Sequence, residues 1–231
     1  MGESKGTLLQ AALRYAELGY PVFPCVPGGK APATAHGFLD ATTDAGQIEA
    51  WWARHPEANV AMPTAGQLVI DVDGAENPWP GDAQKAEGLA GCPVSRTPRG
   101  GRHYIFRQPE GKKWNSTASR LAPKVDTRAN GGYIVLPPSI VGGKPYQWAG
   151  DFASGPSDLP EPPAWLVDQV EGGADLFAQG TDGPAEDIQD TTQGAPVAPE
   201  GVTAAAGGNL IPAGHRNATL ARLGGAMRRV G

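Results

Sequence analysis

The N-terminal part of the chain carries apolar residues at the spacing of an α-helix. They predict one helix over residues 7–18, which Gly19 ends. A second helix is predicted to begin near Thr43 and Asp44, because Gln47 stands at capping-box spacing there. The side chains expected to face the core are Leu9, Ala12, Leu13 and Ala16 in the first helix, and Ile48, Trp51 and Trp52 in the second.

Short apolar runs rich in β-branched and aromatic residues predict strands in the middle of the chain. Residues 21–27 form a short extended run after the first helix. The strands predicted to follow are 59–62, 68–73, 94–97, 102–106, 125–128 and 133–136. Strands interleaved with helices in this way predict an α+β fold with a mostly antiparallel sheet.

The composition changes beyond residue 170. Residues 171–207 are rich in Gly, Ala, Pro, Asp and Thr and contain almost no large apolar side chains, so they cannot bury enough surface to offset ordering. We therefore expect a folded domain over residues 1–170, a flexible acidic linker over 171–207 and a helical segment over 208–231. Leu220, Leu223 and Met227 share one face of that last helix, which has nothing of its own to pack on. We expect the sequence to be part of a longer polypeptide.

Charge is unevenly distributed along the chain. The formal net charge is −5, yet seven of the 24 acidic residues lie between residues 171 and 201, where there is no Lys or Arg. Nine cations lie between Arg96 and Arg128, where only Glu110 and Asp126 oppose them. Local basicity of this kind is what the binding of a polyanion requires. The alternative is a solvated loop, which is the interpretation favoured for the lysines at 112 and 113.

Cysteine content and hydropathy exclude several classes of protein. Cys25 and Cys92 provide neither a disulfide framework nor a four-ligand zinc site. The N-terminus contains no apolar run long enough for a membrane span and no basic-then-apolar signal peptide. We therefore expect a cytoplasmic protein with no membrane partner.

Two acidic residues close the predicted strand 68–73. Asp71 and Asp73 are two positions apart, so both carboxylates point to the same side of a strand, roughly 6–7 Å apart. A divalent cation is the usual reason for two anions to be held so close. The alternative is structural, because Asp73 followed by Gly74 is an ordinary turn dipeptide that closes a strand.

Asp126 and His103 lie on two further predicted strands. Three carboxylates and a histidine on short apolar strands suggest a Mg²⁺- or Mn²⁺-dependent site for phosphoryl chemistry. Asp126 could instead pair with Lys124 or Arg128, its neighbours on the same strand face. A lone histidine is more often structural than a ligand.

Two glycine pairs precede candidate site residues. The pair that ends at Gly101 would let the backbone approach a ligand closely just before His103. The pair before Lys30 is not part of a Walker A loop, because Pro24 and Ala31 occupy positions where that motif requires Gly and Ser or Thr. Lys30 is therefore either a solvated lysine in a turn or a lysine that faces phosphate.

Taken in order, these residues resemble the N-terminal domain of the bifunctional DNA primase/polymerase (prim-pol) family, within the archaeo-eukaryotic primase superfamily. The resemblance covers about residues 8–166. Its landmarks are the runs 27–32, 41–44, 56–60, 69–74, 97–103 and 126–139, together with Ile48, Trp51 and Trp52. The stretch 216–229 also resembles the start of the helical primase C-terminal domain that often follows.

The resemblance implies a fold and an activity. The fold is an archaeo-eukaryotic primase-like core, in which an RRM-like and mostly antiparallel sheet carries the acids, with a smaller N-terminal α/β portion. The activity is template-directed nucleotidyl transfer, that is, primer synthesis plus DNA-polymerase extension in plasmid- or phage-type replication. The implied partners are a single-stranded DNA template, nucleoside triphosphates and a helicase in the same full-length chain. A primase must also hold a second nucleotide where a primer end would sit, which needs an open cleft on the metal face.

The resemblance also assigns roles by position. It implies that Asp71, Asp73 and Asp126 bind two divalent ions, Mg²⁺ or Mn²⁺. It also implies that His103 contacts the triphosphate of the incoming nucleotide. Weaker candidates for nucleotide contacts are Arg128, Lys30 and Gly101. The sequence departs from the pattern twice, because the superfamily often has Ser where this chain has Gly101 and usually has Gly where it has Ala129. Neither departure removes an acidic ligand.

Two other functions are compatible with parts of this pattern. A metal-dependent phosphodiesterase or nuclease can use a similar carboxylate cluster, and it would cleave DNA without nucleotides. A non-catalytic single-stranded-DNA-binding or recruitment module of a replication protein would bind DNA equally well after Asp71→Ala. The presence of all three acids and of His103 argues against a degenerate module.

Overall fold

A computed structural model describes residues 8–172 of the chain. Its helices are α1 (Leu8–Glu17), α2 (Ala45–Arg54), α3 (Ala83–Gly88) and α4 (Ala164–Gly172), with 3₁₀ turns at Gly37–Asp40 and Pro156–Asp158. Its strands are β1 (Phe23–Cys25), β2 (Asn59–Pro63), β3 (Gln67–Val72), β4 (Val94–Arg96), β5 (Arg102–Arg107), β6 (Thr117–Ala122), β7 (Val125–Arg128), β8 (Tyr133–Val135), β9 (Ile140–Val141), β10 (Lys144–Pro145) and β11 (Gln147–Trp148).

The strands form three sheets. A six-stranded sheet has the order β11-β4-β5-β3-β7-β6, a three-stranded sheet has the order β1-β2-β8, and β9 pairs with β10. Neighbouring strands are antiparallel in every one of these pairings. The predicted α+β fold with mostly antiparallel sheets is therefore confirmed.

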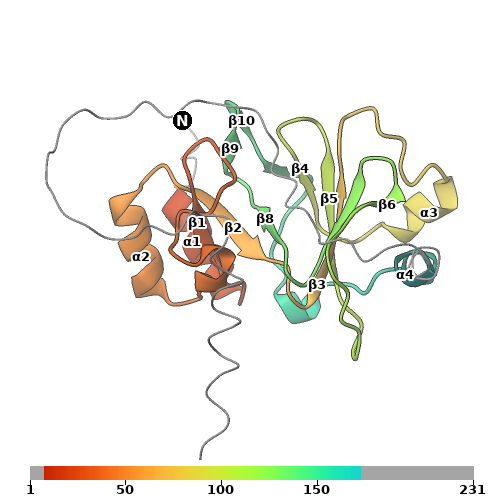
Figure 1. Ribbon diagram of the computed structural model, residues 1–231, viewed down its shortest axis with the longest axis horizontal. Coiled ribbons are helices and arrows are strands. Elements are labelled where there is room, and N and C mark those ends of the chain that lie inside the picture. The colour runs from red at the N-terminus through yellow and green to blue at the C-terminus, as the bar shows by residue number, and fades with distance from the viewer. Residues whose placement is uncertain (1–7, 173–231) are drawn as a thin grey trace, which may run out of the picture. The chain divides into compact units, whose positions relative to one another are not determined.

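Strand β3 lies inside the six-stranded sheet and is covered on both faces. Val69 points toward one apolar cluster, which also contains side chains of α1, α2 and the three-stranded sheet. Leu68 and Ile70 point toward a second cluster, which includes Leu166 of α4. Figure 1 shows α1 and α2 on the side of the three-stranded sheet, and α3 and α4 at the opposite edge. Burial on both faces explains why the sequence here is a continuous apolar run instead of an alternating one.

The start of α2 follows the sequence prediction. Asp44 is the N-cap, and its carboxylate accepts a hydrogen bond from the backbone N–H of Gln47. Ile48 and Trp52 are buried, and the Trp52 indole donates to the carbonyl of Ala58 over 2.9 Å. The helix is therefore fixed at its first turn by a cap and along its length by an apolar face.

Three elements near the site were not predicted from the sequence. Strand β6 has no alternating apolar pattern, and its pairing with β7 contains a register shift. Helices α3 and α4 are short, and α4 extends to Gly172, two residues into the expected linker. The rest of that linker and the expected helix at 208–231 lie outside the described residues.

An ion pair involves one of the two lysines of the basic segment. Lys112 is exposed, and its ammonium group pairs with the carboxylate of Glu171 at 2.6 Å. The same carboxylate accepts a hydrogen bond from the indole of Trp114 over 3.2 Å. The pair therefore joins the end of α4 to the loop after β5. Within residues 8–172, no helix has the length and hydropathy of a membrane span.

Candidate active site

The register of three strands brings the main candidate residues together. Asp71 of β3 lies directly opposite His103 of β5 on one side and Asp126 of β7 on the other. Side chains at facing positions of antiparallel strands point to the same face, with Cβ atoms about 4.5–5.5 Å apart. The sheet therefore presents these side chains as one row across three neighbouring strands.

The two carboxylates of this row share one cation. Nη2 of Arg128 lies 2.9 Å from Oδ2 of Asp126 and 3.4 Å from Oδ2 of Asp71. The other oxygen of Asp126 accepts a hydrogen bond from the backbone N–H of Ser119 over 2.8 Å. The other oxygen of Asp71 lies 3.3 Å from Nε2 of His103. Each carboxylate thus contacts Arg128 through one oxygen and a different partner, His103 or Ser119, through the other.

The pKa values of Asp71 and Asp73 are shifted in opposite directions. Burial raises the pKa of Asp71, but the hydrogen bond to His103 and the charges of Arg128 and Lys30 outweigh it and hold the pKa below its ordinary value. Partial burial raises the pKa of Asp73, and the negative charges of Asp71 and Asp126 add to that rise. Asp73 therefore lies within the electrostatic reach of the other two acids.

Asp73 lies one residue beyond the end of β3. Its backbone N–H donates to the carbonyl of Lys124 over 2.9 Å, and Gly74 then turns the chain with a φ of +83°. Within residues 8–172, no three side chains of the types His, Cys, Asp and Glu converge closely enough to hold a metal ion. The three-acid ligand set therefore stays a prediction, while the pair Asp71 and Asp126 has the chemistry of a divalent-cation site.

The structure gives a physical reason for glycine at position 101. A Cβ atom there would lie 2.3 Å from the carbonyl oxygen of Val72 and 3.0 Å from Oγ1 of Thr97. Any side chain at this position would force the backbone of the two strand ends to shift. The glycine is used for close packing of β5 against the end of β3.

Ser95 is a site residue that the sequence did not reveal. It lies on β4 directly opposite His103, and both residues are almost completely buried. Neither Oγ of Ser95 nor Nδ1 of His103 has a hydrogen-bond partner. A single serine in a short strand carries no signal of its own, and only the strand register places it behind the histidine.

Only some of the cations between Arg96 and Arg128 contact the acids of the site. Arg107 pairs with Glu161 at 2.9 Å, and Arg102 donates to the carbonyl of Asn77 over 3.0 Å. These two cations therefore serve the fold, as Lys112 does. Lys30 comes from the turn after β1 and is close enough to lower the pKa of Asp71. The Tyr133 hydroxyl donates to the backbone carbonyl of Lys30 over 3.2 Å and holds this turn.

Comparison with known proteins assigns the family. Residues 12–165 match the family described as bifunctional DNA primase/polymerase, N-terminal. The match covers more than half of the chain and includes all the site residues described above. A search of curated proteins found no match. The chain therefore belongs to the bifunctional DNA primase/polymerase family, a family of DNA primase/polymerase enzymes, through its N-terminal domain.

Proposed function

We propose that this domain starts primers on single-stranded DNA and extends them as a template-directed DNA polymerase in plasmid- or phage-type replication. The observation that supports this most is the position of Asp71 between His103 and Asp126 on three adjacent strands. We also propose that the six-stranded sheet is the primase-like core, because it carries this row on its inner strands. The family match supports the reaction class, and the strand register supports the location of the site.

The acids are the proposed holders of divalent ions. Asp71 and Asp126 already share a cationic nitrogen, and their oxygen donors suit Mg²⁺ or Mn²⁺, with Asp73 as the third carboxylate. A bound divalent ion activates the attacking hydroxyl and compensates charge on the leaving group in this class of reaction. The 3′-oxygen forms a bond to the α-phosphorus, the bond from that phosphorus to pyrophosphate breaks, and the hydroxyl proton leaves to solvent.

Arg128 has two roles in this proposal. In the ligand-free protein its guanidinium neutralises Asp71 and Asp126. If Asp71 and Asp126 held a divalent ion, the guanidinium of Arg128 would be free to bind the phosphates of the incoming nucleotide, for which its planar donor group is suited. Lys30, in the turn after β1, adds a second positive charge for those phosphates.

His103 is the proposed contact to the triphosphate, and Ser95 is the proposed positioning residue behind it. The Ser95 hydroxyl can donate to Nδ1 of His103 directly or through a buried water, since the two residues face each other and both atoms lack partners. With Nδ1 occupied as an acceptor, the neutral ring carries its proton on Nε2, which is the nitrogen directed at Asp71.

Extension of a labelled primer on a single-stranded template tests the proposed reaction. Wild-type protein with Mn²⁺ or Mg²⁺ is compared with Asp71→Asn and with Glu57→Gln, an exposed acid after α2. We expect extension by the wild type and Glu57→Gln and none by Asp71→Asn. Shortening of the DNA without added nucleotides would favour a nuclease. Unchanged DNA binding with no extension by any of the three proteins would favour a recruitment module.

A further inference from the structure

The run 56–60, a landmark of the family resemblance, contributes no side chain to the row of acids and His103. Within this run, Asn59 is the first residue of β2 and is only 1% exposed. Burial of an asparagine amide is costly unless its donors and its acceptor are hydrogen-bonded inside the protein. The hydrogen-bond partners of Asn59 therefore indicate which segments it holds in place.

Asn59 joins the turn that carries Lys30 to strand β9. Its side-chain amide donates to the carbonyls of Gly29 and Ile140, both over 2.8 Å. Its side-chain oxygen accepts from the backbone N–H of Ile140 over 2.9 Å. Gly29 directly precedes Lys30 in the chain, so the first of these bonds fixes the backbone next to the lysine. One buried amide thus fastens two segments that lie far apart in the sequence.

Two longer hydrogen bonds also attach the turn to the domain. The backbone N–H of Gly142 donates to the carbonyl of Gly28 over 3.4 Å, and the Tyr133 hydroxyl donates to the carbonyl of Lys30 over 3.2 Å. The bond from Asn59 is the shortest of the three and comes from a buried side chain. Lys30 is itself exposed, so the place of its side chain depends on how firmly this turn is held.

The segment around β9 also reaches His103. The hydroxyl of Ser139, the residue before β9, accepts from the backbone N–H of Val60 over 2.8 Å, and its carbonyl accepts from the N–H of Tyr146 over 2.7 Å. Tyr146 is buried, and its ring centroid lies 5.9 Å from that of His103. Asn59 and Ser139 therefore link the turn after β1 to the residue that packs on the histidine.

We propose that Asn59 is a positioning residue for the incoming nucleotide: it holds the turn of Lys30 at a fixed place relative to His103, so that both can contact the triphosphate. This inference rests on the proposed function, which assigns triphosphate contacts to these two residues. The side chain of a lysine is long and flexible, so the protein can place it in advance only through its backbone. The charge of Lys30 reaches Asp71 and Asp73, so the turn is held toward the acids. Asn59 is buried, and it therefore acts through the turn and not through contact with the nucleotide.

A double-mutant cycle tests this assignment. Binding of dATP with Mg²⁺ and without DNA is measured by calorimetry in the wild type, Asn59→Ala, Lys30→Met and the double variant. We expect binding to weaken about fivefold in Asn59→Ala and about tenfold in Lys30→Met. The double variant should bind no more weakly than Lys30→Met alone, because Asn59 acts through the lysine. Unchanged binding by Asn59→Ala, or losses that multiply in the double variant, would overturn the assignment.

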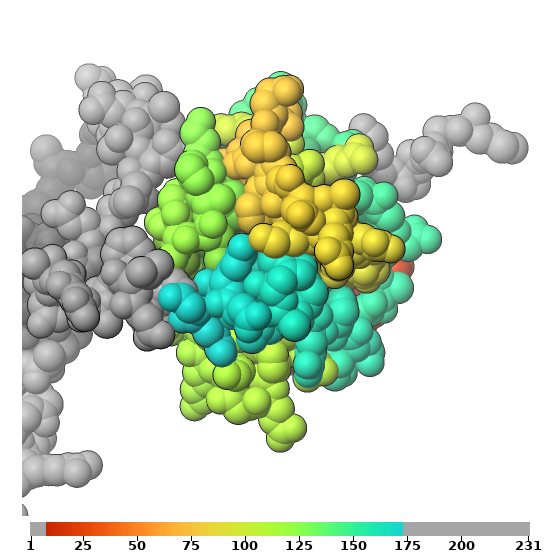
Figure 2. All heavy atoms as spheres, turned by 90° about the vertical axis from the view of Figure 1, so that its right-hand side faces the viewer, coloured from red at the N-terminus to blue at the C-terminus, as the bar shows by residue number. Residues whose placement is uncertain are grey.

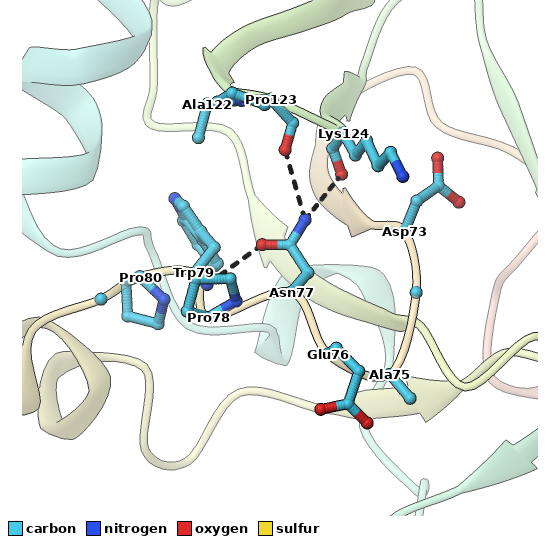
Figure 3. Close-up of a pocket in the computed structure, with 12 residues that line it drawn as sticks. Asp73, Ala75, Glu76, Asn77, Pro78, Trp79, Pro80, Ala122, Pro123 and Lys124 are labelled. Atoms are coloured by element: carbon cyan, nitrogen blue, oxygen red, sulfur yellow. Dashed lines mark hydrogen bonds between the residues drawn. The ribbon is translucent and has the colours of Figure 1, made fainter.

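Asn77 provides the matched control. It lies in the loop 73–81, which Figure 2 shows in orange next to the β6–β7 segment in green. Its side-chain amide also makes three hydrogen bonds, two to carbonyls of the turn 122–124 and one from the backbone N–H of Trp79 (Figure 3). Asn77→Ala removes the same group from a loop with no proposed phosphate contact, so dATP binding should be unchanged. Equal weakening in Asn77→Ala and Asn59→Ala would attribute both losses to a loosened fold and overturn the assignment.

Primer extension separates failure of this inference from failure of the proposed function. In an active enzyme, Asn59→Ala should raise the KM for the incoming nucleotide about fivefold and change kcat by less than about twofold, since the acids are untouched. An unchanged KM would refute the positioning role alone. A wild type that makes no product, but whose dATP binding depends on Asn59 through Lys30, would refute the enzyme alone. Asn59→Ser replaces Asn59→Ala in both measurements if that variant does not fold.

Discussion

At the scale of single residues, the acids of this site differ in what surrounds them. Asp71 is enclosed by His103 and Arg128, whereas Asp73 lies just beyond the end of β3, where burial and the charges of Asp71 and Asp126 outweigh the positive charges of Lys30 and Arg128. The ionised carboxylate is therefore stabilised at Asp71 and destabilised at Asp73. A divalent ion that approaches this edge meets one carboxylate with close cationic partners and one whose negative neighbours outweigh its positive ones.

The opposite pKa shifts predict opposite effects of two substitutions on metal-free stability. The lowered pKa of Asp71 means that its ionised form stabilises the fold above its ordinary pKa, and that this stability is lost as pH falls through the lowered value. The raised pKa of Asp73 has the reverse sign, so protonation at low pH favours the fold. At pH 7, Asp71→Asn should destabilise by about 1–3 kcal/mol. Asp73→Asn should stabilise by less than about 1 kcal/mol, because Asp73 is exposed.

Thermal unfolding with a chelator present measures whether Asp71→Asn destabilises the fold and Asp73→Asn stabilises it. Glu57→Gln serves as the control for loss of one exposed carboxylate. The stabilising effect of Asp73→Asn should shrink as the pH is lowered, since wild-type Asp73 is then protonated too. A lower melting temperature for Asp73→Asn than for the wild type at pH 7 would contradict the account of this edge.

Arg128 and a divalent ion are expected to compete for the same carboxylates. Arg128→Gln removes the guanidinium from Asp71 and Asp126, so Mn²⁺ should bind the nucleotide-free protein several-fold more tightly. The same variant should have a higher KM for the incoming nucleotide, since a phosphate contact is lost. Calorimetric titration with Mn²⁺ measures the first effect and steady-state kinetics the second. Weaker Mn²⁺ binding in Arg128→Gln would contradict this expectation, because it would show that the arginine promotes binding of the ion and does not compete with it.

Ser95→Ala tests whether the buried hydroxyl positions His103. Because one neutral hydrogen bond is worth about 1 kcal/mol, removal of the hydroxyl should lower the free energy of unfolding by no more than about that amount. The kcat/KM for the incoming nucleotide should fall about fivefold, the equivalent of one hydrogen bond of about 1 kcal/mol. The ¹⁵N chemical shifts of His103 should show loss of the single Nε2–H tautomer. Unchanged kinetics and an unchanged tautomer would remove Ser95 from the site.

At the scale of elements, the sequence predicts strands better than it predicts their pairing. The apolar run of β3 is visible because this strand lies in the interior of the sheet, and Asp44 marks the start of α2 by its capping chemistry. Strand β6 is an edge strand with a register shift, and edge strands are not required to carry an apolar pattern. The juxtaposition of Ser95 with His103 depends on strand register, which the sequence alone does not determine.

The close approach of β3 and β5 predicts a large effect of a small side chain at position 101. In Gly101→Ser, the new Cβ would contact the carbonyl oxygen of Val72 at 2.3 Å, so the strand ends must separate. We expect destabilisation of about 1–3 kcal/mol, the usual range for overpacking. Gly150→Ser is the matched control, because the space around Gly150 is open. Equal melting temperatures for the two variants would show that β3 and β5 are not held this tightly.

At the scale of the whole described domain, the site combines residues from two sheets. The acids and His103 come from the six-stranded sheet, and Lys30 follows β1 of the three-stranded sheet. Thr64, which follows β2, binds the segment after β7 through two hydrogen bonds. Its backbone N–H donates to the carbonyl of Gly132, and its hydroxyl donates to the carbonyl of Ala129. These bonds fasten the segment between β7 and β8, which begins directly after Arg128.

The measurement that tests the central claim most directly is primer synthesis on unprimed single-stranded DNA. Labelled nucleotides and Mn²⁺ or Mg²⁺ are supplied to the wild type and to the double variant Asp71→Ala/Asp73→Ala. We expect primers from the wild type and none from the double variant, with DNA binding retained by both. Primers of equal yield from both proteins would show that the acids of β3 are not the reaction centre. Absence of product from the wild type on both unprimed and primed templates would contradict the assignment of polymerase activity to this domain.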